Sequence, residues 1–127
     1  MEILTYLDTH VVLWLYAGEI ERLSKPAFQR ILKYETVISP LVRLELAYLY
    51  ETERITVKPA KILATLEKDV GLKIKDCSSE KLAEEASKMS WTRDPFDRMI
   101  AAQASEENSF LVTKDRVILK NYKKAIW

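Results

Sequence analysis

The chain has 127 residues, of which 48% are hydrophobic, and a formal net charge of +1 at pH 7. This length predicts a single domain, residues 1–127, and two glycines and four prolines exclude a low-complexity or disordered chain. The near-zero charge excludes nucleic-acid binding through a global positive field, so such binding would need local basic groups or metal ions. One cysteine and one histidine exclude an intramolecular disulfide and a Cys/His zinc site, and they favour a reducing compartment.

The N-terminal segment, residues 3–17, is largely apolar but contains Asp8 and His10. It is too short and too charged to span a membrane, and it lacks the basic start of a signal peptide. We therefore expect a buried strand followed by a helix, in a cytoplasmic protein that does not bind membranes.

Hydrophobic spacing, caps and turn residues predict the remaining elements in chain order. In the first half we expect a strand at Ile3–Leu7 and then a helix from about His10 to Tyr16, which Gly18 ends. A second helix starts at Ser24 and has Ala27, Phe28, Ile31 and Leu32 at helical spacing. A strand at Thr36–Ile38 and a helix from Ser39 to about Glu51 follow. In the second half we expect a helix at Lys58–Val70, with Ile62, Leu63, Leu66 and Val70 on one side and Gly71 as its stop, and then a strand at Leu72–Lys75. A helix from Ser78 or Ser79 to about Met89 is followed by a helix that Asp94 caps, with Ile100, Ala101 and Ala104 facing inward. The last elements are a strand at Phe110–Thr113, a short helix from Asp115 and an edge strand at Ala125–Trp127. This alternation predicts an α/β fold with helices on both faces of a mainly parallel central sheet, a three-layer α/β/α arrangement.

Acidic residues follow two of the predicted strands, Asp8 after the first and Asp115 after the fourth, and Asp97 lies at the start of a helix. Ligands of parallel sheets bind beyond the carboxyl ends of the strands. Each acid also has a simple structural explanation, because Asp8, Asp94 and Asp115 suit helix caps and Asp97 suits a first helical turn.

Glu45 is harder to explain by local structure. It shares one helical stripe with Leu41, Leu44 and Tyr48, which we expect to face the core. Burial of an unpaired carboxylate costs several kcal/mol, so Glu45 must be paired, bound to a metal or lifted into a cleft. The alternative to a functional role is a salt bridge with a distant Lys or Arg.

Taken together, Asp8, Glu45, Asp97 and Asp115 are predicted to meet at one edge of the sheet. Carboxylates so placed repel one another unless a cation lies between them, and oxygen ligands suit Mg²⁺. The combination indicates phosphate chemistry.

Four segments resemble the PIN-domain ribonucleases, and within them the VapC-type toxins of toxin–antitoxin pairs. They are Tyr6-Leu7-Asp8-Thr9-His10, Leu44-Glu45-Leu46, Arg93-Asp94-Pro95-Phe96-Asp97-Arg98 with the following Ala101-Ala102-Gln103-Ala104, and Val112-Thr113-Lys114-Asp115. The resemblance spans nearly the whole chain. Some relatives carry a histidine where this chain has Thr92 and often a serine where it has Val42, differences that bear on substrate preference and not on the metal ligands.

The resemblance implies a PIN-like fold and an endoribonuclease that needs Mg²⁺ or Mn²⁺. The catalytic and metal-binding residues would be Asp8, Glu45, Asp97 and Asp115, with Thr113 and Asp94 in support and Arg98, Arg93, Lys114 and Arg116 as candidates for RNA contact. His10 is an open candidate for a catalytic base. The implied partners are an RNA substrate, a cognate antitoxin and a second copy of the chain in a homodimer. Exposed aromatic residues would offer contact surface, but we expect Tyr16, Tyr48, Tyr50 and Trp91 to pack in the core.

Two alternatives belong to other functional classes. A catalytically silent PIN-like domain would bind partners only, although Glu45 would then have no chemical role. A phosphoacceptor receiver domain needs a pair of acids after the first strand, where this chain has only Asp8, and an acidic acceptor after a middle strand, where Val37-Ile38 leads to Ser39-Pro40.

Overall fold

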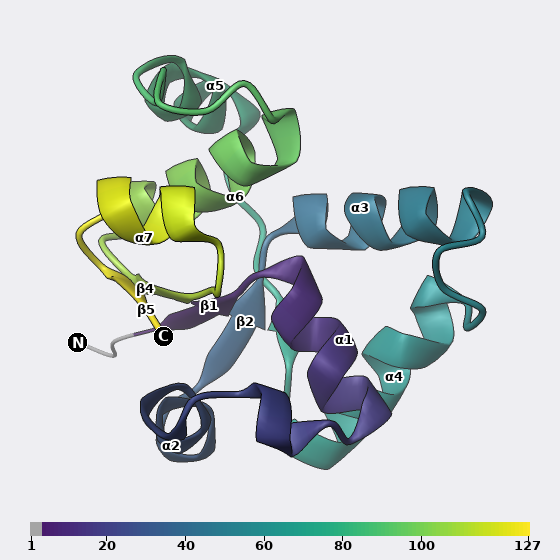
Figure 1. The fold of residues 1–127 in the computed structure, drawn as a ribbon. Coiled ribbons are helices and arrows are strands. Elements are labelled where there is room, and N and C mark those ends of the chain that lie inside the picture. Colours follow the sequence, from purple (N-terminus) through teal and green to yellow (C-terminus); the bar gives the residue numbers. More distant parts are fainter. Residues whose placement is uncertain (1–3) are drawn as a thin grey trace.

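A single parallel sheet organises the computed structural model, which describes residues 4–127 (Figure 1). The strand order is β3-β2-β1-β4-β5, and all neighbouring strands are parallel. The strands are β1 Thr5–Leu7, β2 Thr36–Ile38, β3 Lys73–Ile74, β4 Phe110–Val112 and β5 Ala125–Ile126. The predicted α/β class and parallel sheet are confirmed. The strands other than β2 are shorter than predicted, and Ile3 lies outside the described residues.

Helices cover both faces of this sheet (Figure 1). They are α1 Thr9–Ala17, a 3₁₀ turn at Ile20–Arg22, α2 Lys25–Lys33, α3 Pro40–Glu51, α4 Pro59–Val70, α5 Ser79–Ser87, α6 Pro95–Glu106 and α7 Arg116–Asn121. Right-handed crossovers from β1 to β2 and β3 place α1, α2 and α4 on one face, and the return to β4 and β5 places α5, α6 and α7 on the other. Helix α3 contacts α1, α4 and α6, so it lies where the two helical layers meet.

The chain reverses its winding direction between β1 and β4, which are neighbours at the centre of the sheet. The carboxyl ends at such a reversal form the crevice where α/β proteins bind ligands. Receiver domains share this rule but have the strand order 2-1-3-4-5. The observed order therefore contradicts the receiver-like alternative.

Helix caps agree closely with the sequence. Side chains of Asp8, Ser24, Ser39, Ser78, Asp94 and Asp115 each accept a backbone N–H at a helix start. Gly18 and Gly71 end α1 and α4 at φ +72°, a conformation that glycine adopts without strain. Helix α5 ends at Ser87, before the predicted Met89, and the 3₁₀ turn after α1 was not predicted.

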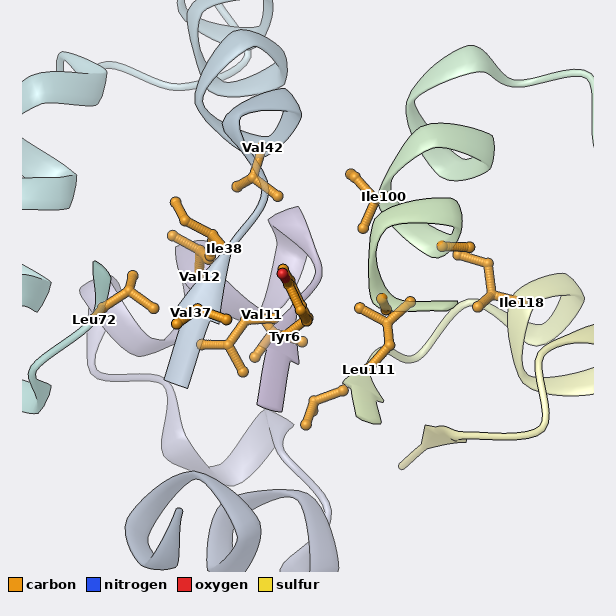
Figure 2. Close-up of a cluster of buried hydrophobic side chains, with 14 of the residues drawn as sticks. Tyr6, Val11, Val12, Val37, Ile38, Val42, Leu72, Ile100, Leu111 and Ile118 are labelled. Atoms are coloured by element: carbon orange, nitrogen blue, oxygen red, sulfur yellow. The ribbon is translucent and has the colours of Figure 1, made fainter. Parts of the chain in front are cut away.

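The core fills both sides of the central strands (Figure 2). Residues of β1, β2 and β4 pack against apolar side chains from both helical layers, and the labelled members are Tyr6, Val11, Val12, Val37, Ile38, Val42, Leu72, Ile100, Leu111 and Ile118. In the part of the chain that the structure describes, no helix is both long and apolar enough to cross a bilayer.

The predicted inward stripe of α3 is wrong. Its buried residues are Val42 and Leu46, whereas Leu44 is 56% exposed and Tyr48 is 53% exposed. This leucine-rich helix carries two apolar stripes, and its position between the layers decides which one is buried. Glu45 is only half-buried, at the boundary between packed and open sides.

Other apolar side chains expected to pack also lie at the surface. Leu32 of α2 is 68% exposed and Val70 of α4 is 39% exposed, because each helix covers the core with a narrow stripe. Tyr50 is 36% exposed, whereas Tyr16 and Trp91 are partly buried and pack against the core as expected.

Candidate active site

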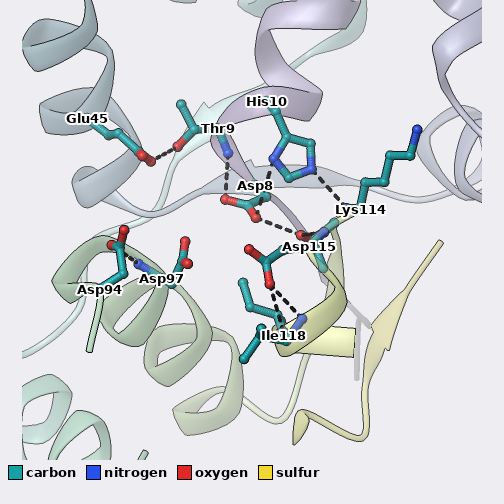
Figure 3. Close-up of polar contacts among 11 residues, drawn as sticks. Asp8, Thr9, His10, Glu45, Asp94, Asp97, Lys114, Asp115 and Ile118 are labelled. Atoms are coloured by element: carbon teal, nitrogen blue, oxygen red, sulfur yellow. Dashed lines mark hydrogen bonds and ion pairs between the residues drawn. The ribbon is translucent and has the colours of Figure 1, made fainter. Parts of the chain in front are cut away.

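Carboxylates from four elements gather beyond the carboxyl ends of β1 and β4, at the crevice position of an α/β sheet (Figure 3). Asp8 follows β1, Asp115 follows β4 at the start of α7, Asp97 lies in the first turn of α6, and Glu45 lies on α3. Burial raises the pKa of Asp97 from 3.8 to about 7, and the negative charges of Asp94, Asp8, Asp115 and Glu45 contribute. The structure thus brings the sequence-predicted acids together.

Asp8 is the most enclosed of these carboxylates, with only 3% of its surface exposed. The backbone N–H of Thr9 donates to its Oδ1 at 2.8 Å, and the hydroxyl of Thr113 donates to its Oδ2 at 2.7 Å. Thr113 is fully buried, and its Oγ1 also accepts the backbone N–H of Asp115 at 3.0 Å. Thr113 therefore fixes the orientation of Asp8 and ties it to the loop that carries Asp115.

Glu45 is held by a residue whose role here the sequence did not reveal. The hydroxyl of Thr9 donates to Oε1 of Glu45, which links the first turn of α1 to α3. Burial raises the pKa of Glu45; the Thr9 hydrogen bond opposes this effect, and the charges of Asp8 and Asp94 add to it. The only sequence signal for Thr9 was a hydroxyl directly after an acid at a helix start.

Asp94 and Asp115 are helix caps as well as neighbours of the crevice. Oδ1 of Asp94 accepts the N–H groups of Phe96 and Asp97 at 2.9 and 3.1 Å. Oδ1 of Asp115 accepts those of Val117 and Ile118 at 2.9 and 3.0 Å. In each case a single oxygen serves the helix, so the cap explanation and a role in the site are compatible.

His10 bridges α1 and the loop after β4. Its Nε2 accepts the backbone N–H of Lys114 at 2.8 Å, and its Nδ1 lies 3.7 Å from Oδ2 of Asp8. Burial lowers the pKa of His10, and the charges of Asp8 and Asp115 oppose this effect. A neutral ring with its proton on Nδ1 satisfies both contacts, so the ring supports the loop and Nε2 is not free to act as a base.

Of the candidate RNA contacts, Arg93, Lys114 and Arg116 are exposed. Arg98 is half-buried, and its Nε and Nη2 donate to the carbonyl oxygen of Thr92 at 3.2 and 2.7 Å. Arg98 thereby braces the loop that leads into α6 and positions Asp94.

The donor set suits a hard divalent cation. Carboxylate and hydroxyl oxygens are the ligands that Mg²⁺ and Mn²⁺ prefer, and a cation would relieve the repulsion that adds to burial in raising the pKa of Asp97. Between residues 4 and 127, no three Asp, Glu, His or Cys side chains converge closely enough to enclose an ion directly. This spacing is consistent with Mg²⁺, which usually keeps several waters and binds few carboxylates directly.

Known proteins resemble this chain in sequence and in fold. A family model described as PIN domain matches residues 5–124. Ribonuclease VapC22 of Mycobacterium tuberculosis is 36% identical over 116 residues, which cover 87% of this chain and 85% of that protein.

Two solved structures show the same fold at low sequence identity. VapBC2 from Rickettsia felis, bound to a DNA fragment from their promoter, matches with a TM-score of 0.69 at 16% identity, over 98% of this chain and 96% of that chain. A toxin–antitoxin complex from Klebsiella pneumoniae matches with a TM-score of 0.67 at 14% identity, over 97% of this chain and 96% of that chain.

Proposed function

We propose that this chain, which belongs to the PIN domain family, is a metal-dependent endoribonuclease and the toxin of a toxin–antitoxin pair. One observation carries the proposal: carboxylates from four elements meet beyond the ends of β1 and β4, where burial and then the charges of the neighbouring acids raise the pKa of Asp97 to about 7. The 36% identical relative is named a ribonuclease, which supports RNA as the substrate.

Asp8, Asp97 and Asp115, with Glu45 beside them, would hold Mg²⁺ or Mn²⁺ directly or through water. When bound, such an ion lowers the pKa of a water molecule and stabilises the departing oxygen of the phosphodiester. The chain itself supplies the alignment, because Thr113 orients Asp8 and the loop of Asp115 together.

Glu45 is suited to accept a proton from the attacking water. Its raised pKa makes the Glu45 carboxylate a stronger base than an ordinary glutamate, and the Thr9 hydroxyl occupies only its Oε1. The exposed Arg93, Lys114 and Arg116 would contact phosphates on either side of the crevice. Arg98 would act on the RNA only indirectly, through the loop that it braces.

The proposed partners are a cognate antitoxin, which would cover the toxin, and a second copy of the chain in a homodimer. The antitoxin is supported by structural neighbours that are toxin–antitoxin complexes. An enzyme with cellular RNA as its substrate would act in the cytoplasm. Co-expression with the product of the adjacent open reading frame, followed by copurification and measurement of the mass of the complex, tests both partners.

The activity is tested by incubating purified chain with cellular RNA and mapping new 5′ ends in Mg²⁺, in Mn²⁺ and in EDTA. We expect cuts that require the metal and disappear in Asp97→Asn. The matched control is Asp69→Asn, which removes an exposed carboxylate of α4 away from the crevice and should cut like the wild type.

A catalytically silent PIN-like domain remains the alternative function. It predicts that wild type and Asp97→Asn leave the same RNA ends in every buffer. Cutting by Asp97→Asn at the wild-type rate would instead show that the nuclease does not use this crevice.

A further inference from the structure

Two aromatic rings from different helices meet beside the carboxylate crevice. Tyr48 of α3 is 53% exposed, and its ring centroid lies 6.5 Å from that of Phe96 in the first turn of α6. The ring planes are inclined by 33° to one another. The Tyr48 ring contributes little to the core, because α3 buries Val42 and Leu46 instead.

The pair is tied to the crevice through both helices. Tyr48 follows Glu45 by three positions, so the two side chains share a face of α3. Phe96 directly precedes Asp97, and the N–H groups of both residues donate to the Asp94 carboxylate. The ring of Tyr48 therefore lies one helical turn from Glu45, and Phe96 lies in the same helical turn as Asp97.

Electrostatic attraction alone would bind RNA weakly beside these carboxylates. The net charge of the chain is +1, and the crevice gathers negative charge that repels phosphate when no cation is present. Aromatic rings stack on any nucleobase, and proteins that bind single-stranded nucleic acids use this contact to hold the chain of bases.

We propose that Tyr48 and Phe96 form a stacking platform for one nucleobase of a single-stranded RNA, which positions the neighbouring phosphate over the carboxylates. The inference rests on the proposed ribonuclease function and adds a base-binding subsite to it. The competing occupant is a second copy of the chain, because Leu44 on the same helix is also exposed, at 56%. The position of Tyr48 one helical turn from Glu45 favours RNA.

The test measures binding of a short single-stranded RNA, and of a series of the same RNA in which one nucleotide at a time is abasic. The full chain carries Asp97→Asn throughout, so that the RNA stays intact. Stacking predicts that Tyr48→Leu weakens binding of the intact RNA by about 5- to 150-fold, the loss typical of one stacked base. It also predicts that one abasic position costs the Tyr48 protein the same factor but costs the Tyr48→Leu protein nothing.

Matched variants separate stacking from loss of apolar area. Tyr48→Phe and Tyr48→Trp keep a ring and should retain affinity. Tyr50→Leu removes an exposed tyrosine from another face of the same helix and should bind like its parent. Phe96→Leu should reproduce the loss at the same abasic position, with its melting temperature measured because Phe96 also packs against the core.

Several outcomes would overturn the platform. Unchanged affinity in Tyr48→Leu would do so, as would an equal loss for every abasic RNA. A change from dimer to monomer in both Tyr48→Leu and Leu44→Ala, with RNA affinity intact, would assign the surface to a second copy of the chain. If the wild type cuts RNA while these variants behave normally, the platform alone fails; if the wild type neither binds nor cuts RNA, the proposed function fails as well.

Discussion

At the scale of single residues, most of the acids at the crevice also accept a structural hydrogen bond. Asp94 and Asp115 use one oxygen to cap a helix, and Asp8 accepts from Thr9 and Thr113. Asp97 has the largest electrostatic penalty, because burial and the neighbouring carboxylates disfavour its ionised form. A site that is costly to charge without a counter-ion is a site that gains from binding one.

Asp97→Asn should therefore stabilise the metal-free protein in a pH-dependent way. The pKa of Asp97 rises from 3.8 to about 7 on folding, so the contribution of Asp97 to stability is greatest below about pH 4 and falls as the pH rises to about 7. The full shift corresponds to about 4 kcal/mol, which partial exposure reduces to about 1–2 kcal/mol. Urea unfolding in EDTA should show this gain for Asp97→Asn at about pH 8 and none at about pH 4.

The exposed-site variant Asp69→Asn is the control for this measurement and should follow the wild type at both pH values. A gain for Asp97→Asn that is equal at both pH values would contradict an electrostatic origin.

At the scale of elements, the site depends on helix starts. Helices α1, α6 and α7 are capped by Asp8, Asp94 and Asp115, so the positive ends of their dipoles lie beside the acids and offset part of the repulsion. Helix α7 has only six residues and depends strongly on its cap. Asp115 is therefore a place where stability and activity can be separated.

Asp115→Asn keeps a capping oxygen and removes the charge, whereas Asp115→Ala removes both. We expect Asp115→Ala to lower the free energy of unfolding by about 1 kcal/mol and Asp115→Asn to lower it by less than half of that, while both variants lose RNA cleavage. Chemical denaturation in EDTA and a cleavage assay, run on the same samples, check this. Equal destabilisation by the two substitutions would show that the cap is not the stabilising contact.

At the scale of the whole molecule, the crevice gathers side chains from both helical layers and from the two central strands. A cation bound there would join α1, α3, α6 and α7 in one network. Binding would then be visible as global stability, because the unfolded chain cannot assemble these ligands.

Mg²⁺ or Mn²⁺ at about a hundred times its dissociation constant should add about 2.7 kcal/mol to the free energy of unfolding and raise the melting temperature by on the order of 10 °C. Asp8→Asn should lose most of this gain, whereas Asp69→Asn should keep it. Thermal unfolding at matched ionic strength, with NaCl in place of the divalent salt, removes general screening from the comparison. An equal shift for Asp8→Asn would argue against metal binding in the crevice.

Local sequence patterns were enough to predict the types of the helices and strands, most of their boundaries and the strand-end positions of Asp8 and Asp115. These features follow from local rules: caps at Asp94 and Ser39, glycine at the left-handed ends of α1 and α4, and buried apolar runs in the strands. Local rules work here because caps and turns depend on neighbours within about four residues.

Three features depend on long-range packing and could not be predicted: which side of α3 is buried, the contact of Thr9 with Glu45, and the hydrogen bonds of Arg98 to the Thr92 carbonyl. Periodicity shows that α3 has apolar stripes but cannot choose between Val42 with Leu46 and Leu44 with Tyr48. The choice depends on contacts with α1, α4 and α6, which lie far away along the chain. For the same reason the pKa of Asp97 is a property of the fold, since it depends on burial and on charges brought from three other elements.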